Sequence, residues 1–302
     1  MIQGYTFIGV CDGHGEDGQN VSEYLKNTLP QEFNKDLQKI ISSENKRFSI
    51  LESILEKNWK EQINEEEIKK KAKFNLIENI ENYKKMKEIF KNVFLTTNLK
   101  LIEEKCMFNL ENSGSTCVSV LLQKKDIKKI YIANVGDSRA ILIKEPSKDN
   151  DSWSYEQLSR DHVPSEKDEA ERILKNGGEI QQIQNENGEW EGPLRIFMKN
   201  EEGPGLAMSR SFGDVMGSIL GIIAEPEVKE YLIKKEDKAI IIATDGLWEY
   251  VSNEEVTNTI KNLINKNNAD LIVKELYKLS YEKWKNKYTS VDDITIICIL
   301  LN

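Results

Sequence analysis

The sequence has little histidine and cysteine: two histidines and four cysteines in 302 residues. Cys11, Cys106, Cys117 and Cys298 are far apart and form no Cys-x-x-Cys pair. Zinc sites of the cysteine or histidine type need such clusters, and a disulfide framework needs an ordered set of cysteines. Both are therefore excluded. We interpret the cysteines as reduced core residues of a cytoplasmic or nuclear protein.

Long apolar runs and an excess of positive charge are also missing. No stretch approaches the length of a membrane-spanning helix, and the first residues match neither a signal peptide nor a lipidation motif. The net charge of −9 argues against nucleic acid or a membrane as partner, but it tolerates a site that holds cations. With 39% hydrophobic and 31% charged residues, the composition predicts a globular protein, which we take to be a monomer.

What the sequence does contain is a short apolar run that stops at a carboxylate, in residues 7–15 (FIGVCDGHG). A run of this kind with turn residues behind it predicts a buried strand, so Asp12 and His14 should lie at the edge of a core. Mg²⁺ or Mn²⁺ would suit the carboxylate and backbone carbonyl there. An Asp-Gly turn after an edge strand explains the same residues equally well.

Two further predicted strands adjoin aspartates. Residues 239–244 (AIIIAT) precede Asp245, and Asp292 comes shortly before residues 294–301 (ITIICILL). If these carboxylates meet Asp12 at one edge of a sheet, they raise one another's pKa unless metal ions neutralise them. Such a cluster is typical of two-metal hydrolysis of a phosphate ester. Spacing alone does not show that the three converge.

The remaining pattern predicts helices around strands, in one domain of layered sheets. An apolar repeat from Met86 to Leu101 predicts an amphipathic helix, and two more are expected between residues 253 and 287. An early helix is expected to end at Pro30. The other expectations are weak solvent-facing helices over 31–85, an antiparallel meander of 115–123, 129–134 and 138–144, a helix opened by Ser165 and ended by Gly177-Gly178, and an irregular loop over 179–225.

Eight segments resemble, in the same order, those of the metal-dependent Ser/Thr protein phosphatases of type 2C. They are FIGVCDGHG (7–15), SGSTCV (113–118), IANVGDSRAIL (132–142), LSRDHVPSEKDEAERILKNGG (158–178), GLAMSRSFGD (205–214), AEPEV (224–228), ATDGLWEYV (243–251) and DDIT (292–295). The resemblance implies an α+β fold, a four-layer α-β-β-α sandwich of two mainly antiparallel β-sheets flanked by helices. It implies a single domain over 1–302, with a charged helical insertion at 31–85 and a flap at 190–225.

The resemblance also implies an activity, the hydrolysis of phosphoserine and phosphothreonine on protein substrates with two Mg²⁺ or Mn²⁺ ions. Asp12 resembles the carboxylate that bridges both ions, and the carbonyl of Gly13 resembles a ligand of one of them. Asp245 and Asp292 resemble ligands of the other. A hydroxide that bridges the ions would attack phosphorus, and His14 resembles the general acid that protonates the leaving oxygen.

Several further positions follow from the same resemblance. Asp161 and Glu249 resemble ligands of a weaker third ion, although Glu249 stands where Asp is common. His162 is more simply explained by packing beside a proline turn than by catalysis. We interpret Asp137 and Arg139 as structural residues that support the sheet, and Arg210 as a residue that holds the flap.

The chain departs from the family pattern at its start. Relatives carry an upstream segment with an Arg that grips phosphate and a Glu-Asp pair, and no residues here match it. We therefore expect either a fragment of an active enzyme or a shortened variant with weakened metal binding. Two function classes remain open: a metal-dependent Ser/Thr phosphatase, and a catalytically weak module of the same fold that binds or regulates. Asp12, His14, Asp245 and Asp292 together favour the enzyme. A nuclease fits poorly, because the chain lacks a basic groove.

Overall fold

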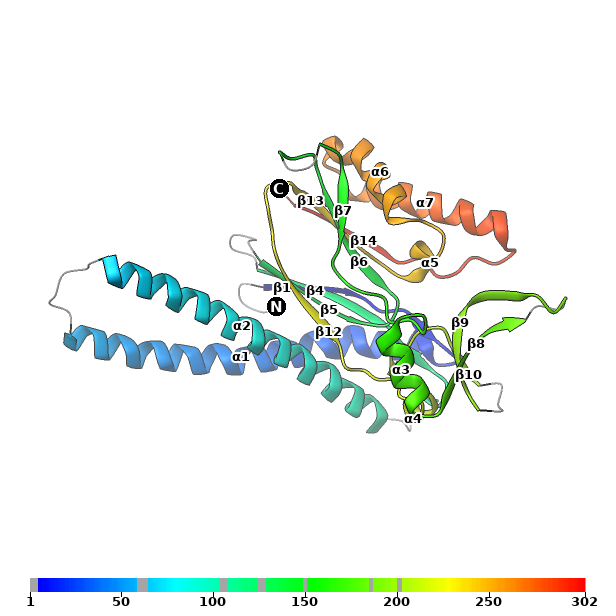
Figure 1. Ribbon diagram of the computed structural model, residues 1–302, viewed down its shortest axis with the longest axis horizontal. Helices are drawn as coiled ribbons and strands as arrows, with labels where there is room; N and C mark the ends of the chain where they lie inside the picture. Colours follow the sequence, from blue (N-terminus) through cyan, green and yellow to red (C-terminus); the bar gives the residue numbers. More distant parts are fainter. Residues whose placement is uncertain are drawn as a thin grey trace.

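Two four-stranded antiparallel β-sheets lie face to face, with helices on both outer faces (Figure 1). The computed structural model describes residues 5–58, 65–103, 108–123, 129–148, 151–184, 187–199 and 203–301, with side chains outside 40–83. This arrangement confirms the α+β class and the α-β-β-α sandwich. None of the described helices has the length and apolar character needed to cross a membrane.

The two sheets differ in strand order. The first sheet consists of β1 (Tyr5–Val10), β4 (Cys117–Gln123), β5 (Lys129–Val135) and β12 (Glu227–Leu232), in that order. The second consists of β14 (Ile296–Leu300), β13 (Asp237–Ala243), β6 (Arg139–Lys144) and β7 (Ser154–Gln157). Neighbouring strands in these sheets are antiparallel.

The apolar runs predicted as strands are strands because both of their faces are buried. In β13, Ile240 and Ile242 pack between the sheets, whereas Ile241 and Ala243 pack against the helices on the outer face. Side chains alternate across a strand, so a strand covered on both sides must be apolar at every position. The predictions of strands at residues 239–244 and 294–301 are confirmed in position.

The predicted meander is only partly correct. Strands β4 and β5 pair as predicted, but β6 belongs to the other sheet and pairs with β13 and β7. The chain crosses between the sheets at residues 136–138, where Gly136 has a φ of 104° that favours glycine. Three successive apolar runs do not reveal such a crossing, because runs in either sheet are equally apolar.

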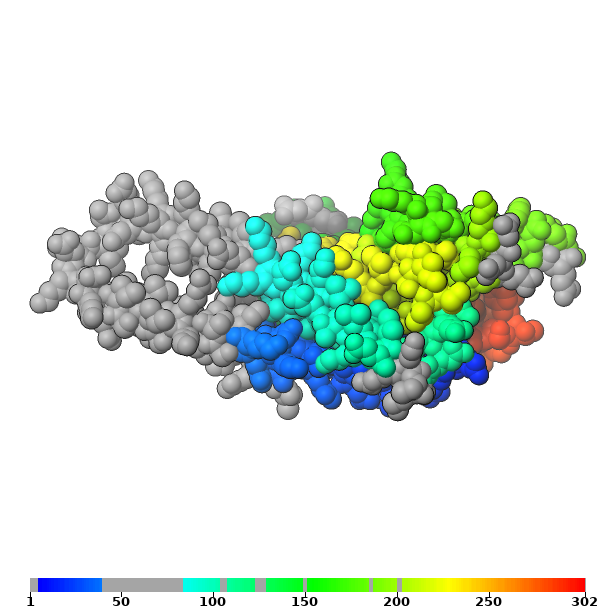
Figure 2. Space-filling model, turned by 90° about the horizontal axis from the view of Figure 1, so that it is seen from below, coloured from blue at the N-terminus to red at the C-terminus, as the bar shows by residue number. Residues whose placement is uncertain are grey.

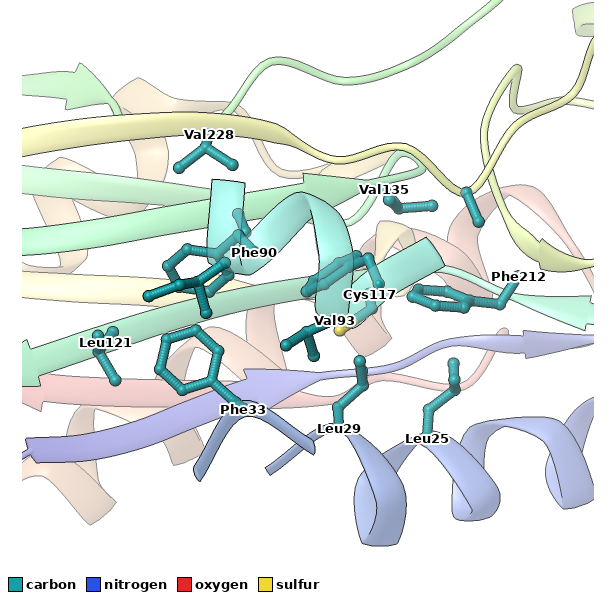
Figure 3. Packing of buried hydrophobic residues seen from close by; sticks show 14 of the residues in the cluster. Leu25, Leu29, Phe33, Phe90, Val93, Cys117, Leu121, Val135, Phe212 and Val228 are labelled. Atoms are coloured by element: carbon teal, nitrogen blue, oxygen red, sulfur yellow. The ribbon is translucent and has the colours of Figure 1, made fainter. Parts of the chain in front are cut away.

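Helices α1 (Gly18–Asn58) and α2 (Glu65–Glu103) cover the first sheet. Figure 3 shows Leu29 and Phe33 of α1 beside Phe90 and Val93 of α2, and the rings of Phe33 and Phe90 have centroids 4.6 Å apart. The apolar repeat from Met86 therefore lies on a buried face, as predicted. Seen from below in Figure 2, the described ends of both helices lie side by side along one face.

The prediction that the first helix ends at Pro30 is wrong, since α1 continues through this residue to Asn58. A proline inside a helix costs about 3 kcal/mol, because it removes one hydrogen bond and crowds the preceding turn. Leu25, Leu29 and Phe33 are fully or almost fully buried on both sides of it. Burial of each such side chain stabilises by about 1.5–3 kcal/mol, which outweighs the cost.

The second sheet is covered by α5 (Asp245–Trp248), α6 (Asn253–Leu263) and α7 (Ala269–Lys287), which confirms the two helices predicted between 253 and 287. The other helices are α3 (Lys167–Lys175), α4 (Val215–Ile219) and a 3₁₀ turn at Ile264–Lys266. Helix α3 follows Glu166, which makes no side-chain cap, so the cap predicted for Ser165 is wrong.

Residues 179–225 are not one irregular loop, as the sequence suggested. Strands β8 (Gly178–Gln184), β9 (Trp190–Met198) and β10 (Pro204–Leu206) form a three-stranded antiparallel sheet. The prediction failed because the glycines of this segment are typical of loops. Much of the sheet is also exposed, so its sequence lacks the apolar character of a core strand. A second small sheet joins β11 (Phe212–Gly213), β3 (Gly114–Ser115) and β2 (Gly13–His14).

The described cysteines fit the prediction for a reduced protein. Cys11, Cys117 and Cys298 are free thiols. Cys106 lies outside the described residues.

Candidate active site

Asp12 follows the last residue of β1 at the end of the first sheet. Its backbone is held by Thr116: the Asp12 amide donates to Thr116 Oγ1 at 3.2 Å, and the Thr116 amide donates to the Asp12 carbonyl at 2.9 Å. The same hydroxyl lies 2.8 Å from Ser138 Oγ, which is next to Asp137. One buried threonine therefore ties together two segments that each carry an aspartate.

Asp245 and Asp292 come from the second sheet, at the end of β13 and just before β14. Thr244 joins the two segments, because its amide donates to the Thr295 carbonyl and its hydroxyl donates to the Asp293 carbonyl, both at 3.1 Å. Gly246 permits this approach: a Cβ there would lie 2.2 Å from the Asp293 carbonyl oxygen. Any other residue would push the two acidic segments apart.

The carboxylates of the two sheets converge, a point that the sequence spacing alone left open. Burial raises the pKa of Asp12 to about 9, with further contributions from the charge of Asp245, a hydrogen bond with it, and the charge of Asp292. Burial and the charge of Asp245 also raise the pKa of Asp292. Asp12 of the first sheet therefore lies close to Asp245 and Asp292 of the second, and a cation between them would relieve their repulsion.

Asp137 belongs to this cluster, so its interpretation as a support of the sheet is wrong. Burial raises its pKa to about 8, and the charges of Asp245 and Asp161 raise it further. Asp137 follows the end of β5, just as Asp12 follows β1. The signal that identified Asp12, an apolar strand ending at an aspartate, would also have identified Asp137.

The structure pairs Asp161 with Arg139, whereas the resemblance implied that Asp161 is a ligand of a third metal ion. Both of its carboxylate oxygens accept hydrogen bonds from Arg139, at 2.9 Å to Nε and 2.5 Å to Nη2. Arg139 is fixed in turn by Asn253 at 3.0 Å and by the ring of Trp248 at 5.2 Å. The structural interpretation of Arg139 therefore holds, whereas Asp161 stands behind Asp137 in a bidentate ion pair.

Glu249 lies at the rim of the cluster. Burial and the charge of Asp245 raise its pKa, and the charge of Lys287 acts in the opposite direction. Its backbone amide donates to the Asp245 carbonyl at 2.8 Å, which places it one helical turn from that residue. Its carboxylate remains within electrostatic reach of both Asp245 and Asp292.

The donor set fits a hard divalent cation by its chemistry. Asp12, Asp137, Asp245 and Asp292 offer carboxylate oxygens, the ligands that Mg²⁺ and Mn²⁺ prefer. The raised pKa values show that these carboxylates are poorly compensated by protein cations. Within the described part of the chain, no three His, Cys, Asp or Glu side chains already surround a common point as ligands. The carboxylates would therefore adjust their rotamers around an ion.

Gly13 provides the backbone carbonyl that the sequence predicted as a ligand. It pairs with Ser115 in the small sheet, and a Cβ on it would lie 2.0 Å from the carbonyl oxygen of Gly18. The contact with the first turn of α1 therefore requires glycine. The role of its carbonyl stays a prediction.

His14 sits beside the carboxylates and is paired with a buried aspartate. Its Nε2 lies 2.7 Å from Oδ2 of Asp214, whose side chain is fully buried and which also accepts a hydrogen bond from Ser211. Gly114 makes room for this carboxylate, since a Cβ there would lie 2.2 Å from Oδ2. Burial lowers the pKa of His14, but the hydrogen bond and charge of Asp214 raise it more, so the net pKa is raised.

The chain is similar to known phosphatases along its length. A family model described as Protein phosphatase 2C matches residues 55–285. Probable protein phosphatase 2C 72 of Arabidopsis thaliana is 33% identical over 310 residues, which span 100% of this chain and 80% of that relative. The chain belongs to the protein phosphatase 2C family.

Further relatives agree. Probable protein phosphatase 2C 1 of Arabidopsis thaliana is 31% identical over 304 residues, and the match spans 100% of this chain but only 61% of that relative. The crystal structure of a serine-threonine phosphatase 2C from Toxoplasma gondii matches with a TM-score of 0.71 at 20% identity, covering 98% of this chain and 84% of that one. The resemblance and the enzyme class, a protein serine/threonine phosphatase, are thereby confirmed.

The flap of this phosphatase 2C chain is anchored by one buried carboxylate. Glu169 of α3 is fully buried and accepts hydrogen bonds from Arg210 at 2.6 Å, from Arg172 at 2.5 Å and from Ser209 at 2.5 Å. Arg210 therefore holds the segment between β10 and β11, as predicted. His162 is also structural in its contacts, since it is buried and its Nδ1 accepts the Gly136 amide at 3.2 Å.

Sequence reasoning missed Asp214 as well as Asp137. Asp214 is the last residue of the phosphatase 2C segment at 205–214, so the motif contained it but gave no reason to single it out. Its partner His14 lies 200 positions away in the chain. Its φ of 44°, which is unusual for a residue other than glycine, is a property of the folded chain alone.

Proposed function

We propose that this phosphatase 2C chain hydrolyses phosphoserine and phosphothreonine on proteins at the carboxylate cluster between its two sheets. Asp12, the Gly13 carbonyl, Asp245 and Asp292 would hold Mg²⁺ or Mn²⁺. Bound ions would supply positive charge opposite the phosphoryl oxygens and a more acidic water as nucleophile. The observation that carries the proposal is the meeting of poorly compensated carboxylates from both sheets beside the His14 imidazole.

Asp137 is the better placed partner of Asp245 for a third ion. The charge of Asp245 acts directly on its pKa, whereas the carboxylate of Asp161 is engaged by Arg139. We assign Asp161 the task of orienting Arg139 at the back of the site. Glu249, at the rim of the cluster, would be a further ligand of this third ion.

His14 would act as the general acid. A serine or threonine alkoxide is a poor leaving group, so a proton must reach its oxygen as the bond to phosphorus breaks. The raised pKa of His14 favours its protonated form near neutral pH, and Asp214 fixes the direction of the ring. The orientation is that of a catalytic imidazole held by a carboxylate.

Phosphate release from a phosphothreonine peptide tests the proposal, first with Mn²⁺ and then with a chelator. Asp245→Asn should lower kcat/KM at least about 100-fold, because several kcal/mol of charge stabilisation is lost. Asp151→Asn, an exposed aspartate in a loop, is the matched control and should change nothing. Folded protein that binds Mn²⁺ but releases no phosphate would instead favour a binding or regulatory module of the same fold.

A further inference from the structure

A cavity lies near the carboxylate cluster, where strand β9 approaches the C-terminal ends of α5 and α7. Its volume is about 640 Å³. Figure 1 shows the hairpin of β8 and β9 projecting on the side of the sandwich where α5 and the end of α7 lie. The side chains that line the cavity and matter below are Trp190, Glu191, Glu249, Tyr250, Lys287 and Tyr288.

The cavity shares one residue, Glu249, with the proposed active site. Glu249 lines it and is also within electrostatic reach of Asp245 and Asp292. A peptide whose phosphate lies over the carboxylates would therefore place a flanking side chain in this cavity. Binding there would act on the choice of substrate and would not require any change in the chemistry.

Its walls are aromatic and accessible. Trp190 of β9 is 60% exposed. The rings of Tyr250 and Tyr288 have centroids 6.2 Å apart and form the opposite wall. An indole on a strand and two phenols just beyond the ends of α5 and α7 line one space, an arrangement that suits a planar or cationic group.

The cavity already accepts a cation. Lys287 Nζ lies 4.4 Å from the centroid of the Tyr250 ring. Glu191 and Glu249 line the same cavity as this ring. The lining thus combines two carboxylates with the ammonium of Lys287, and Arg195 of β9 also lies within electrostatic reach of Glu249.

We propose that this aromatic-acidic cavity binds an arginine side chain of the phosphoprotein substrate, at a position near the phosphorylated residue. A guanidinium can stack on Trp190 or Tyr250 and pair with Glu191, which an apolar or acidic side chain cannot do. Lys287 competes for the same ring face. The inference rests on the proposed function only for the place of the phosphate.

Binding and turnover of matched peptides test the proposal separately. The peptides are phosphothreonine peptides with a single arginine placed in turn at each flanking position, and the same peptides with citrulline, which keeps the shape but not the charge. Non-hydrolysable phosphonate versions with a fluorescent label give Kd by anisotropy in the presence of Mn²⁺. At one position, the arginine peptide should bind about three- to tenfold more tightly, the range of one well-placed cation–π contact.

The variants should change this preference in opposite directions. Trp190→Ala and Glu191→Gln should reduce the ratio of the two Kd values toward one. Lys287→Ala should increase the ratio, because it uncovers the Tyr250 ring and removes the competing charge; a merely structural role would not produce a gain. Tyr277→Ala, an exposed aromatic residue 48% accessible on the same helix α7, is the control and should leave the ratio unchanged.

Each outcome decides one of the two proposals. Turnover without any preference for arginine overturns the proposal that the cavity binds arginine. A preference that Trp190→Ala and Lys287→Ala leave intact overturns it as well. An arginine preference in binding without phosphate release supports the cavity and overturns the proposed function. Neither binding nor turnover overturns both.

Discussion

His14 Nε2 and Asp214 Oδ2 lie 2.7 Å apart, although the two residues are 200 positions apart in the chain. The carboxylate is fully buried and is held by Ser211, so it cannot swing away from the ring. Gly114 leaves the space that it occupies. The imidazole next to the carboxylate cluster is therefore fixed in one orientation by the small sheet that joins β2, β3 and β11.

Asp214→Asn should lower kcat on a phosphothreonine peptide by up to about 100-fold, part of the roughly 10²–10⁴-fold effect of a general acid. The effect on p-nitrophenyl phosphate should be much smaller, since its leaving group departs without a proton. Initial rates on both substrates with Mn²⁺ measure the difference between the two losses of kcat. An equal loss on both substrates would show that Asp214 acts on the fold or on ion binding and not through His14.

Mn²⁺ should raise the melting temperature of the protein. Burial and neighbouring carboxylates raise the pKa of Asp12 to about 9 and that of Asp137 to about 8, so a cation that compensates these carboxylates stabilises the folded state. An ion present at about 100 times its Kd stabilises by about 2.7 kcal/mol. With an unfolding entropy of about 2.1 cal/mol/K per residue, the melting temperature of this 302-residue chain should rise by about 4 °C.

Differential scanning fluorimetry with Mn²⁺ and with a chelator measures this shift. Asp245→Asn should lose most of it, and Asp151→Asn should retain it. An equal shift in all three proteins would place the ion elsewhere.

Glu169→Gln should destabilise the fold by about 3–5 kcal/mol, the usual cost of breaking a buried ion pair from one side. The amide cannot satisfy both Arg210 and Arg172, which would keep their charges in a buried place. Urea unfolding measures the change. Glu171→Gln on the same helix, whose carboxylate is 68% exposed, should stay within about 0.5 kcal/mol of the parent; a similar loss in both would mean that the helix and not the ion pair is responsible.

The stabilisation that Arg160 provides should disappear in acid. Its guanidinium contacts the Asp168 carboxylate at 2.7 and 2.8 Å and lowers the pKa of that group to about 2. A lowered pKa stabilises the fold above the ordinary value of 3.8 and loses this effect as the pH falls toward about 2.

Arg160→Gln should therefore lower the melting temperature at pH 7, and the difference from the parent should shrink below about pH 4. Melting curves across this range measure it. Because Asp168 is largely exposed, the effect at neutral pH is modest and should weaken with salt. A difference that stays constant with pH would assign the role of Arg160 to packing.

The strand-end aspartates could be predicted from sequence because strong local signals mark them. Residues 239–243 are apolar at every position since both faces are buried, and Asp245 follows two positions after this run. Asp12 follows the same rule. Asp137 obeys it too and was overlooked only because its motif suggested a structural role.

Other features could not be predicted because distant contacts decide them. The continuation of α1 through Pro30 depends on packing against α2 and the first sheet. The place of β6 in the second sheet depends on its pairing with β13, a segment about 100 residues later. The partnership of Asp161 with Arg139 depends on a side-chain rotamer, to which sequence spacing gives no access.

The division of the carboxylates between two sheets links catalysis to the core of the protein. Asp12 comes from one sheet, and Asp245 and Asp292 come from the other, so their separation is set by the thickness and alignment of the apolar layer between the sheets. A displacement of about 1 Å in a catalytic group can cost about 10²-fold in rate. Residues such as Val120 and Ile240, which pack between the sheets, are therefore spacers on which the geometry of the proposed site depends.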